Sequence, residues 1–480
     1  MKVDKLRIKI ICKILIAFIS LIVIIFYLKI SGNLSIRNNT SIVILDSNGN
    51  EIYKVTERLN ITADDEVIIK ENGVADSIIS QVVVDLQNKQ GLSFDEAISL
   101  LSSKEYKIYS TIDMSIQEKL NDSFKDRSIF TTTTNSKFNQ AAMVIMDYEG
   151  NIKAVATGNN GDTTKNRAAT ELIKVGSTIK PISIYSLAVE KDLINFSTII
   201  DDIPGNTTFN GKAIEWPTNY NNKYETNVTI TQALKKSKNT IAVKVGEMIG
   251  EEEIFNFLKE QLNYSTLVES KTGDTDKQLS ALALGYFTKG ITLDTLVSSY
   301  SMIGNGGYYS GKRYYTEVID SSGDILISNE SNKRRVISEE SATIMNRLLL
   351  NNIVDEDSII KDIKIDEIEI LGKTGTVGND RKENTSQLFV GMTPDYIAGV
   401  WIGYDDGRAL MQELYNNPTK VWQSVMSNIE LENNAFKLSN NVKKLDYCSD
   451  SGLLKSDSCK NIKIGYYKES NIPDICDIHN

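Results

Sequence analysis

The 480-residue sequence has one histidine, His479, only six prolines and no excess of positive charge. Its 53 Lys and Arg residues are outnumbered by 63 Asp and Glu residues, which gives a net charge of −10 at neutral pH. A negative chain repels phosphate backbones, so this charge argues against nucleic acid as a partner. No internal repeat and no low-complexity linker is present. The scarcity of proline accompanies an abundance of Ile, Asn and Lys, which we interpret as a bias in base composition rather than a functional signal.

One long hydrophobic run lies near the N-terminus. Residues 10–27 are almost entirely apolar, and basic residues precede them at Lys2, Lys5, Arg7 and Lys9. About 20 apolar residues span a bilayer, and the basic end stays in the cytoplasm. A cleaved signal peptide is the alternative, but the run lacks an A-x-A-like exit and is long for such a peptide. We expect a cytoplasmic tail at 1–9, a transmembrane anchor at 10–30 and a single-pass membrane protein whose remainder lies outside the cytoplasm.

Three short polar motifs follow in order along the rest of the chain. They are S-T-I-K at 177–180, S-K-N at 237–239 and K-T-G-T at 373–376. A serine and a lysine three apart on a helix lie on one face, within hydrogen-bond reach of each other. A serine needs such a neighbour because it is a poor nucleophile at its free pKa. The spacing therefore places Ser177 within reach of Lys180, although a serine at a helix start is by itself more typical of an N-cap and a lysine three residues later of a solvated side chain.

Each motif is weak by itself, because the chain contains second copies. Ser358 and Lys361 form another S-x-x-K, and residues 271–273 form another K-T-G. No S-x-N lies between Ser358 and the later K-T-G, and residues 269–277 are polar with no strand before them. Lys373 instead follows an apolar segment and precedes two apolar runs at 388–392 and 396–404 that a T-P-D turn joins. This context is typical of a sheet with a tight turn.

The ordered trio resembles the active site of the penicillin-binding proteins and serine β-lactamases. Flanking segments strengthen the resemblance to class A penicillin-binding proteins, and the similarity runs from about Tyr106 to the C-terminus. These segments are Tyr109-Ser110-Thr111-Ile112-Asp113, Asn166-Arg167-Ala168, Trp216-Pro217-Thr218-Asn219-Tyr220, Phe389-Val390-Gly391-Met392-Thr393-Pro394 and Val400-Trp401-Ile402-Gly403-Tyr404-Asp405.

The resemblance implies a role for each motif residue in acyl transfer. Ser177 would attack the carbonyl of a D-alanyl-D-alanine stem peptide, and Lys180 would be the general base. Lys180 must be neutral to accept the proton, so burial and a neighbouring cation, Lys373, would have to lower its pKa. Ser237 would relay the proton to the leaving D-alanine, and Asn239 would hold Lys180 and the substrate amide. Lys238, in the middle of its motif, is interpreted as a variable position.

The resemblance also implies residues that bind the substrate. Thr374 and Thr376, with Gly375 between them, would bind the terminal carboxylate, and the backbone N–H groups of Ser177 and Thr376 would form the oxyanion hole. Trp216 and Tyr220 are candidates for lining a substrate groove, with core packing an equal alternative for both.

The resulting hypothesis is a membrane-anchored peptidoglycan D,D-transpeptidase that binds β-lactams. A D,D-carboxypeptidase, or a catalytically silent penicillin-binding sensor or scaffold, is the alternative. The expected partners are stem peptides, β-lactams, the membrane and a separate glycosyltransferase. The stretch between a hairpin at 41–55 and Tyr109 is too short for a glycosyltransferase domain, and the His-containing motif of that reaction is missing. No E-x-x-L-N pattern lies between Asn239 and Lys373, so fast β-lactam hydrolysis is not expected.

The pattern of elements predicts an α+β fold. Strands at both ends of the main domain and helical patterns between them indicate an antiparallel sheet flanked by helices, with a helical subdomain. We expect a linker or N-terminal stub at 31–105, a transpeptidase domain at 106–430 and a Cys-containing tail at 431–480.

Three cysteines and the single histidine lie in that tail, spaced C-x10-C-x16-C-x2-H. No cofactor is expected for the chemistry, but Cys448, Cys459, Cys476 and His479 suit a structural zinc ion. A Cys448–Cys459 disulfide is an alternative that an oxidising exterior permits, and unpaired thiols are the third. The zinc site and the disulfide both predict a small closed module at 445–480.

Overall fold

The fold is that of a computed structural model of the chain. It describes residues 41–479 apart from 56–59, 62–66, 69–71, 127–128, 131–139, 160–161, 163–164, 210–211, 271–272, 380, 382 and 411–416. The anchor expected at 10–30 lies outside the described residues. Within the described ranges, no helix is both long and apolar enough to span a bilayer.

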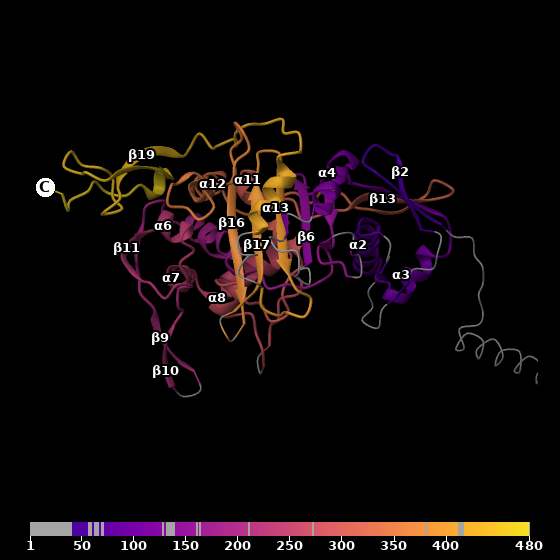
Figure 1. Ribbon diagram of the computed structural model, residues 1–480, viewed down its shortest axis with the longest axis horizontal. Coiled ribbons are helices and arrows are strands. Elements are labelled where there is room, and N and C mark those ends of the chain that lie inside the picture. The colour runs from indigo at the N-terminus through magenta and orange to yellow at the C-terminus, as the bar shows by residue number, and fades with distance from the viewer. Residues whose placement is uncertain are drawn as a thin grey trace, which may run out of the picture.

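A five-stranded antiparallel sheet forms the centre of the molecule, with the strand order β16-β17-β18-β6-β7 (Figure 1). The register pairs Lys373 with Val390 and Val400 with Met143, so the late strands lie beside an early hairpin. β16 is an edge strand, which leaves one side of the K-T-G segment for other elements. The strands are β6 (Gln140–Asp147), β7 (Ile152–Ala156), β16 (Leu371–Gly378), β17 (Asn384–Met392) and β18 (Tyr396–Gly403).

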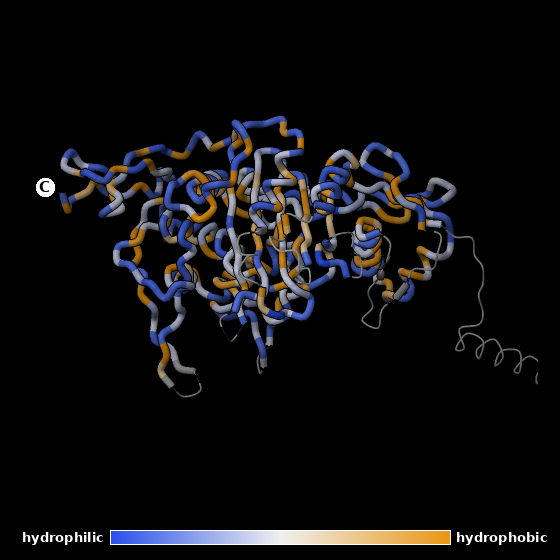
Figure 2. The backbone as a smooth tube through the Cα atoms, viewed as in Figure 1, coloured by the Kyte–Doolittle hydropathy of each residue, from blue (hydrophilic) through white to orange (hydrophobic). Residues whose placement is uncertain are grey.

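Both faces of the central sheet are buried, which explains the nearly continuous apolar sequence of its strands. Val144 and Met146 belong to the larger core cluster, whereas Met143 and Ile145 belong to a second cluster on the opposite face. Apolar residues accordingly gather along these strands (Figure 2). The helices that pack on the sheet are α4 (Met114–Lys125), α10 (Leu293–Ser299), α12 (Glu339–Val354) and α13 (Asn417–Met426).

A helical subdomain lies between β7 and β16 in the sequence. It supplies the second wall of the site described below, and its arrangement beside the antiparallel sheet confirms the predicted α+β fold. Its helices are α5 (Ser186–Glu190), α6 (Ile230–Lys235), α7 (Asn239–Ile249), α8 (Glu251–Asn256), α9 (Leu279–Leu282) and α11 (Ser301–Gly304). Short paired strands between them are β8 (Ile199–Asp202) with β11 (Glu225–Thr229), β9 (Gly205–Phe209) with β10 (Lys212–Trp216), and β12 (Tyr308–Tyr309) with β15 (Arg334–Arg335).

The segment before Tyr106 is part of a second sheet. Its order is β14-β13-β5-β1-β2, and β1 pairs in parallel with β5, with Ile42 opposite Tyr106. The segment that we expected to be a linker or stub therefore contributes two strands of this sheet and two helices, α2 and α3. The elements are β1 (Ile42–Leu45), β2 (Glu51–Val55), α2 (Gly73–Gln90), α3 (Phe94–Leu101), β5 (Tyr106–Ser110), β13 (Tyr315–Asp320) and β14 (Ile325–Ser328), with a separate two-residue pair β3 (Asn60–Ile61) and β4 (Val67–Ile68).

The C-terminal segment forms a hairpin of β19 (Lys443–Cys448) and β20 (Ile462–Tyr467) at one end of the molecule (Figure 1). It packs against the chain just before β8. The ring of Phe196 meets Tyr447, Tyr466 and Tyr467 edge-on. The Tyr467 hydroxyl donates to Ser197 Oγ over 2.9 Å. The tail is thus joined to the helical subdomain by packing and by hydrogen bonds.

Candidate active site

Ser177 lies in a tight turn of 3₁₀ helix, Gly176–Ile179. A π turn, Pro181–Tyr185, and then α5 continue the chain, so three helical segments of different pitch follow one another here. Gly176 has a φ of +54°, and a Cβ there would lie 2.6 Å from the carbonyl oxygen of Thr376. Only glycine allows both the turn and this close approach to β16. The sequence therefore presents Ser177 directly beside the K-T-G strand.

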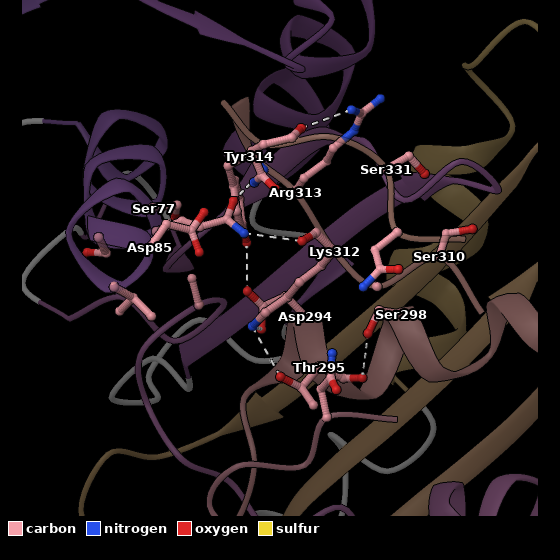
Figure 3. A pocket seen from close by; sticks show the side chains of 18 of the residues that line it. Ser77, Asp85, Asp294, Thr295, Ser298, Ser310, Lys312, Arg313, Tyr314 and Ser331 are labelled. Atoms are coloured by element: carbon pink, nitrogen blue, oxygen red, sulfur yellow. Dashed lines mark hydrogen bonds and ion pairs between the residues drawn. The ribbon is translucent and has the colours of Figure 1, made fainter. Parts of the chain in front are cut away.

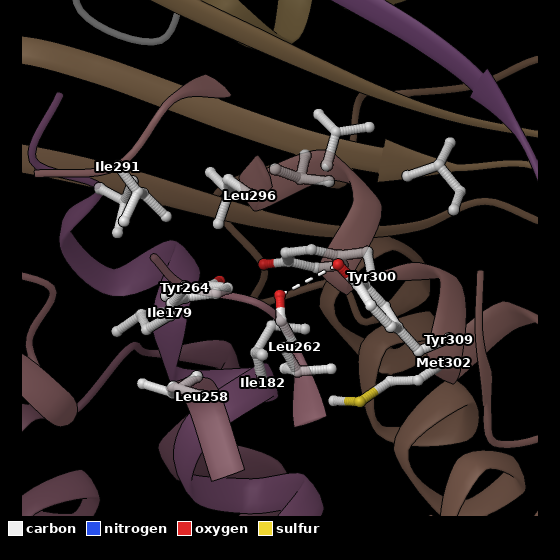
Figure 4. Close-up of a cluster of buried hydrophobic side chains, with 14 of the residues drawn as sticks. Ile179, Ile182, Leu258, Leu262, Tyr264, Ile291, Leu296, Tyr300, Met302 and Tyr309 are labelled. Carbon is white, nitrogen blue, oxygen red and sulfur yellow. Dashed lines mark hydrogen bonds between the residues drawn. The ribbon is translucent and has the colours of Figure 1, made fainter. Parts of the chain in front are cut away.

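A cluster of buried hydrophobic side chains, which includes Ile179 and Tyr300, packs against this turn (Figure 4). The Tyr300 hydroxyl donates to the backbone carbonyl of Thr178 over 2.6 Å, and the Thr178 hydroxyl donates to the carbonyl of Val175 over 2.6 Å. Ile179 and Ile182 extend from the turn into the same cluster. The turn that carries Ser177 is thereby fixed by packing and by hydrogen bonds to its own carbonyls.

Lys180 is completely buried, with an exposed fraction of 0%. Its Nζ donates to the carbonyl oxygen of Ser237 over 2.7 Å and to Asn239 Oδ1 over 2.6 Å, and it lies 3.5 Å from Ser237 Oγ. Burial lowers the pKa of Lys180 well below that of a free lysine, and the nearby Lys373 ammonium lowers it further. Lys180 is therefore held in the S-K-N motif, and its neutral form is more accessible than that of a free lysine.

The S-K-N motif occupies the sharp connection between α6 and α7. Ser237 has a φ of +54°, a left-handed conformation that costs free energy for a residue with a side chain. Asn239 begins α7, and its side-chain amide donates to the carbonyl of Thr218 over 2.8 Å. Its backbone N–H donates to Asn219 Oδ1 over 2.9 Å. These contacts join the motif to the loop that follows Trp216.

Lys373 reaches the same place from β16. Its Nζ donates to Ser237 Oγ over 2.9 Å and to the carbonyl of Thr374 over 3.0 Å. Its exposed fraction is 2%, and burial lowers its pKa from 10.5 to about 7. The hydroxyl of Ser237 thus lies between two buried lysines. Mutual repulsion disfavours two positive charges at this separation.

Ser177, Ser237 and Asn239 line one cavity of about 490 Å³ together with Thr374 and Thr376. Gly375 lies between the two threonines, and a Cβ there would come within 2.6 Å of the carbonyl of Val175. The glycine therefore allows β16 to pack directly on the segment that leads into Ser177. The other lining residues are Thr218, Asn219, Tyr220, Asn222, Lys236, Leu284, Tyr286, Ile359, Gly378, Asn379, Asn384 and Gln387.

Comparison with known proteins identifies the family to which the chain belongs. Residues 140–406 match the family model of the penicillin-binding protein transpeptidase domain. The chain belongs to this family. It is 27% identical over 404 residues to penicillin-binding protein 1A of Clostridium perfringens strain ATCC 13124, a match that covers 79% of this chain and 47% of that protein. The chain spans about half the length of the curated relatives it matches.

Solved penicillin-binding proteins share the fold of this chain. Penicillin-binding protein 1A of Haemophilus influenzae superposes with a TM-score of 0.65 at 15% identity, covering 91% of this chain and 99% of that one. PonA1 of Mycobacterium tuberculosis, solved in complex with penicillin V, superposes with a TM-score of 0.61 at 19% identity, covering 77% and 96%. At these identities the likeness establishes the fold alone.

The two aromatic candidates of the transpeptidase domain occupy different environments. Trp216 precedes a cis peptide bond to Pro217 and packs against the large core cluster, and it is not among the residues that line the cavity. Tyr220 lines the cavity with an exposed fraction of 77%, and its hydroxyl accepts a hydrogen bond from Asn384 Nδ2 over 3.3 Å. The structure thus brings Tyr220 to the cavity and leaves Trp216 as a packing residue.

Lys238, which was interpreted from sequence as a variable position, takes part in a buried ion-pair network, and its variability stays a prediction. Its ammonium forms ion pairs with Asp202 over 2.6 Å and with Glu225 over 2.9 Å, and its exposed fraction is only 4%. Asp202 also accepts hydrogen bonds from the side chains of Asn219 and Thr240. Asp202 and Asn219 are the supporting residues that sequence reasoning missed, because their contacts depend on the pairing of β8 with β11.

The second S-x-x-K copy is not assembled as a site. Ser358 is buried, and its hydroxyl donates to the carbonyl of Asn352 at the end of α12. The exposed Lys361 donates to the carbonyl of Glu356. The second K-T-G includes residues 271–272, which lie outside the described residues.

A larger cavity, of about 740 Å³, lies between α2, α10 and the chain before β13 (Figure 3). Its most buried charged residue is Asp294, which pairs with Lys312 and accepts a hydrogen bond from the Tyr314 hydroxyl over 3.0 Å. Because this carboxylate is already neutralised, we do not assign chemistry to this cavity. The four metal-ligand candidates, Cys448, Cys459, Cys476 and His479, come together in the C-terminal hairpin as a cluster that could hold a metal ion.

Proposed function

We propose that this chain is a peptidoglycan D,D-transpeptidase that forms an acyl-enzyme on Ser177 and is acylated there by β-lactams. The observation that carries the proposal is the hydroxyl of Ser237, which lies 2.9 Å from Lys373 Nζ and 3.5 Å from Lys180 Nζ. Ser237 lines the same cavity as Ser177. Buried lysines with lowered pKa are rare on structural grounds and common where a proton must be transferred.

Acylation would begin with transfer of the Ser177 hydroxyl proton to the neutral amine of Lys180. Ser177 Oγ would then form a bond to the carbonyl carbon of the penultimate D-alanine. The charge on the carbonyl oxygen would be stabilised by the backbone N–H groups of Ser177 and Thr376. The proton would pass from Lys180 through Ser237 to the amine of the leaving D-alanine as the C–N bond breaks. An acceptor amine would attack the resulting ester and release Ser177.

Substrate binding would use the strand beside the nucleophile. Thr374 and Thr376 line the cavity from β16, and protonated Lys373 would supply a positive charge for the terminal carboxylate. Asn239 holds Lys180 with its side-chain oxygen, so it would keep the amine aimed at the reaction. Tyr220 lies at the exposed rim, where it would contact the donor peptide.

We also propose that residues 10–30 anchor the chain in the cell membrane, with the transpeptidase domain outside the cytoplasm and a separate glycosyltransferase supplying glycan strands. The sequence supports this by its apolar run with basic residues before it. We expect the full-length chain to resist alkaline extraction from membranes. We also expect a protease added at the outer side to cleave within residues 41–479.

The function is tested by labelling with a fluorescent penicillin. Wild-type chain should form one covalent adduct, Ser177→Ala none, and Ser358→Ala the same adduct as wild type. Ser358 is a matched control because it is the serine of the second S-x-x-K. Turnover of a D-alanyl-D-alanine peptide with an added amine acceptor should then give the cross-linked product. Exclusive hydrolysis to the shortened peptide would contradict transpeptidation, and an adduct on Ser177→Ala would contradict the assigned nucleophile.

A further inference from the structure

The C-terminal hairpin brings together the three cysteines and the histidine that follow the transpeptidase domain. Cys448 ends β19, Cys459 lies in the connection to β20, and Cys476 and His479 follow β20. All three thiols are buried, with exposed fractions of 0%, 8% and 5%. Residues far apart in the sequence thus place four metal-ligand side chains at one point.

The distances among the four candidate ligand atoms match those of a tetrahedral metal site. His479 Nδ1 lies 3.4 Å from Cys448 Sγ, 3.5 Å from Cys459 Sγ and 3.4 Å from Cys476 Sγ. All four atoms lie within 4.8 Å of one another. A tetrahedral zinc site has Zn–S bonds of about 2.3 Å and Zn–N bonds of about 2.0 Å, so its S···N edges are about 3.5 Å long. We propose that Cys448, Cys459, Cys476 and His479 bind one zinc ion.

Hydrogen bonding alone does not account for this arrangement. A neutral imidazole has one N–H, and that proton cannot point at three sulfur atoms at equal distances. Equal distances from one nitrogen to three thiols are the expected result when all four atoms surround a common centre. All three cysteines are unpaired, so a Cys448–Cys459 disulfide is not formed here.

Neighbouring polar groups complete a second layer around the four ligands. The other ring nitrogen of His479, Nε2, lies 3.5 Å from Asp450 Oδ2, which leaves the lone pair on Nδ1 when the proton is on Nε2. Ser451 donates its hydroxyl to Cys476 Sγ over 3.2 Å, and the backbone N–H of Ser456 donates to Cys459 Sγ over 3.3 Å. Such donors stabilise thiolates, which are the form that binds metal.

The site has four protein ligands and so has no position for substrate, which makes it structural rather than catalytic. Among the described residues, the apolar side chain that packs against the three cysteines in this small cluster is Leu453. Because this cluster holds so little apolar surface, a further link would stabilise it beyond the ring contacts that already join the hairpin to Phe196. The zinc ion would supply that link and would hold the turn at Gly452, whose carbonyl accepts a hydrogen bond from Ser197 Oγ over 2.6 Å. Metal binding would thereby keep the module docked beside β8.

The test uses the full-length chain carrying Cys12→Ser, which removes the one cysteine outside the cluster and serves as the matched control. Purified from zinc-supplemented cells, it should contain about one zinc per chain. Its three thiols should react with a thiol reagent slowly until a chelator is added. Replacement of zinc by Co²⁺ should give the visible absorption of a tetrahedral thiolate site, a result that needs no ligand variant.

Ligand variants locate the ion. Cys459→Ser should lose the metal. His479→Gln changes the half-buried ligand and should lose the metal or bind it much more weakly. Asp450→Asn should weaken affinity about 10–100-fold while leaving the stoichiometry unchanged. Three rapidly reacting thiols with no bound zinc would overturn the proposal. The proposal would also be overturned if, without reductant, the chain had one reactive thiol and a mass two hydrogens below that of the reduced chain. That result would identify a disulfide.

Discussion

Lys238 Nζ lies 2.6 Å from Asp202 Oδ2, and the exposed fractions of the two side chains are 4% and 0%. The second oxygen of the same carboxylate accepts a hydrogen bond from Asn219 Nδ2 over 2.6 Å. Asn219 in turn accepts the backbone N–H of Asn239 over 2.9 Å. One buried ion pair therefore supports the residue that orients Lys180.

Lys238→Met should be strongly destabilising because it leaves the Asp202 carboxylate buried without its cation. Removing one partner of such a pair costs roughly 3–5 kcal/mol of unfolding free energy. Lys236→Met is the matched control, since Lys236 pairs with Glu225 over 2.6 Å at the surface and exposed pairs contribute about 1 kcal/mol or less. Urea unfolding of both variants measures the difference, and equal losses would contradict the assigned role of Lys238.

Lys180→Arg should acylate with penicillin about 10²–10⁴-fold more slowly than wild type, because a guanidinium cannot act as a base. Lys174→Arg is the control, since Lys174 is an exposed lysine that packs over the ring of Tyr286 and should acylate normally. Stopped-flow acylation compares the two variants. Near-normal acylation of Lys180→Arg would mean that another group accepts the proton.

The acylation rate should depend on pH as a bell-shaped curve. It should fall near pH 7 as Lys373 loses its proton and its charge, and its rising side should lie well below the range of a free lysine, because the base must be neutral and burial with the nearby Lys373 lowers the pKa of Lys180. Rates for a carboxylate-bearing β-lactam measured from pH 5 to pH 10 test this expectation. A rate that stays constant between pH 6 and pH 9 would show that Lys373 does not titrate in this range.

Lys373 should also make the folded state less stable at neutral pH. Its pKa falls from 10.5 to about 7 on folding, so the unfolded chain binds more protons between these values and stability rises with pH there. The penalty is fully present below pH 7 and vanishes above pH 10.5. Lys373→Met should therefore gain up to roughly 4 kcal/mol at pH 6, and less as the pH rises, while losing acylation. If the difference in unfolding free energy between wild type and Lys373→Met stayed the same from pH 6 to pH 10, the lowered pKa of Lys373 would be contradicted.

Much of the site was accessible from the sequence because its chemistry is carried by three compact motifs. Their order and the family resemblance predicted that Ser177, Ser237 and Lys373 belong together, and the structure places Ser237 Oγ 2.9 Å from Lys373 Nζ. The central strands were predictable as well, since their apolar runs and turns are local features. The roles assigned to the individual residues stay predictions that the labelling and kinetic experiments test.

What the sequence did not reveal depends on contacts between distant segments. The pairing of Ile42 with Tyr106 joins two strands in parallel, and nothing local in either strand encodes the partner. The same holds for Asp202, whose environment forms only when β8 meets β11. The close approach of Gly176 to the carbonyl of Thr376 is likewise a contact between distant segments, which helical periodicity does not contain.

The parallel pairing of β1 with β5 has a practical consequence for dissecting the protein. A fragment that starts at Tyr106, where the family resemblance begins, would remove β1 and β2 and leave the backbone of β5 without a neighbour on that side. It would also remove α2, whose Ile78, Ile79 and Val82 are fully covered in the intact chain. An uncovered strand edge beside bare apolar surface invites pairing with other chains. Such a fragment should aggregate, so the useful N-terminal cut lies before Ile42.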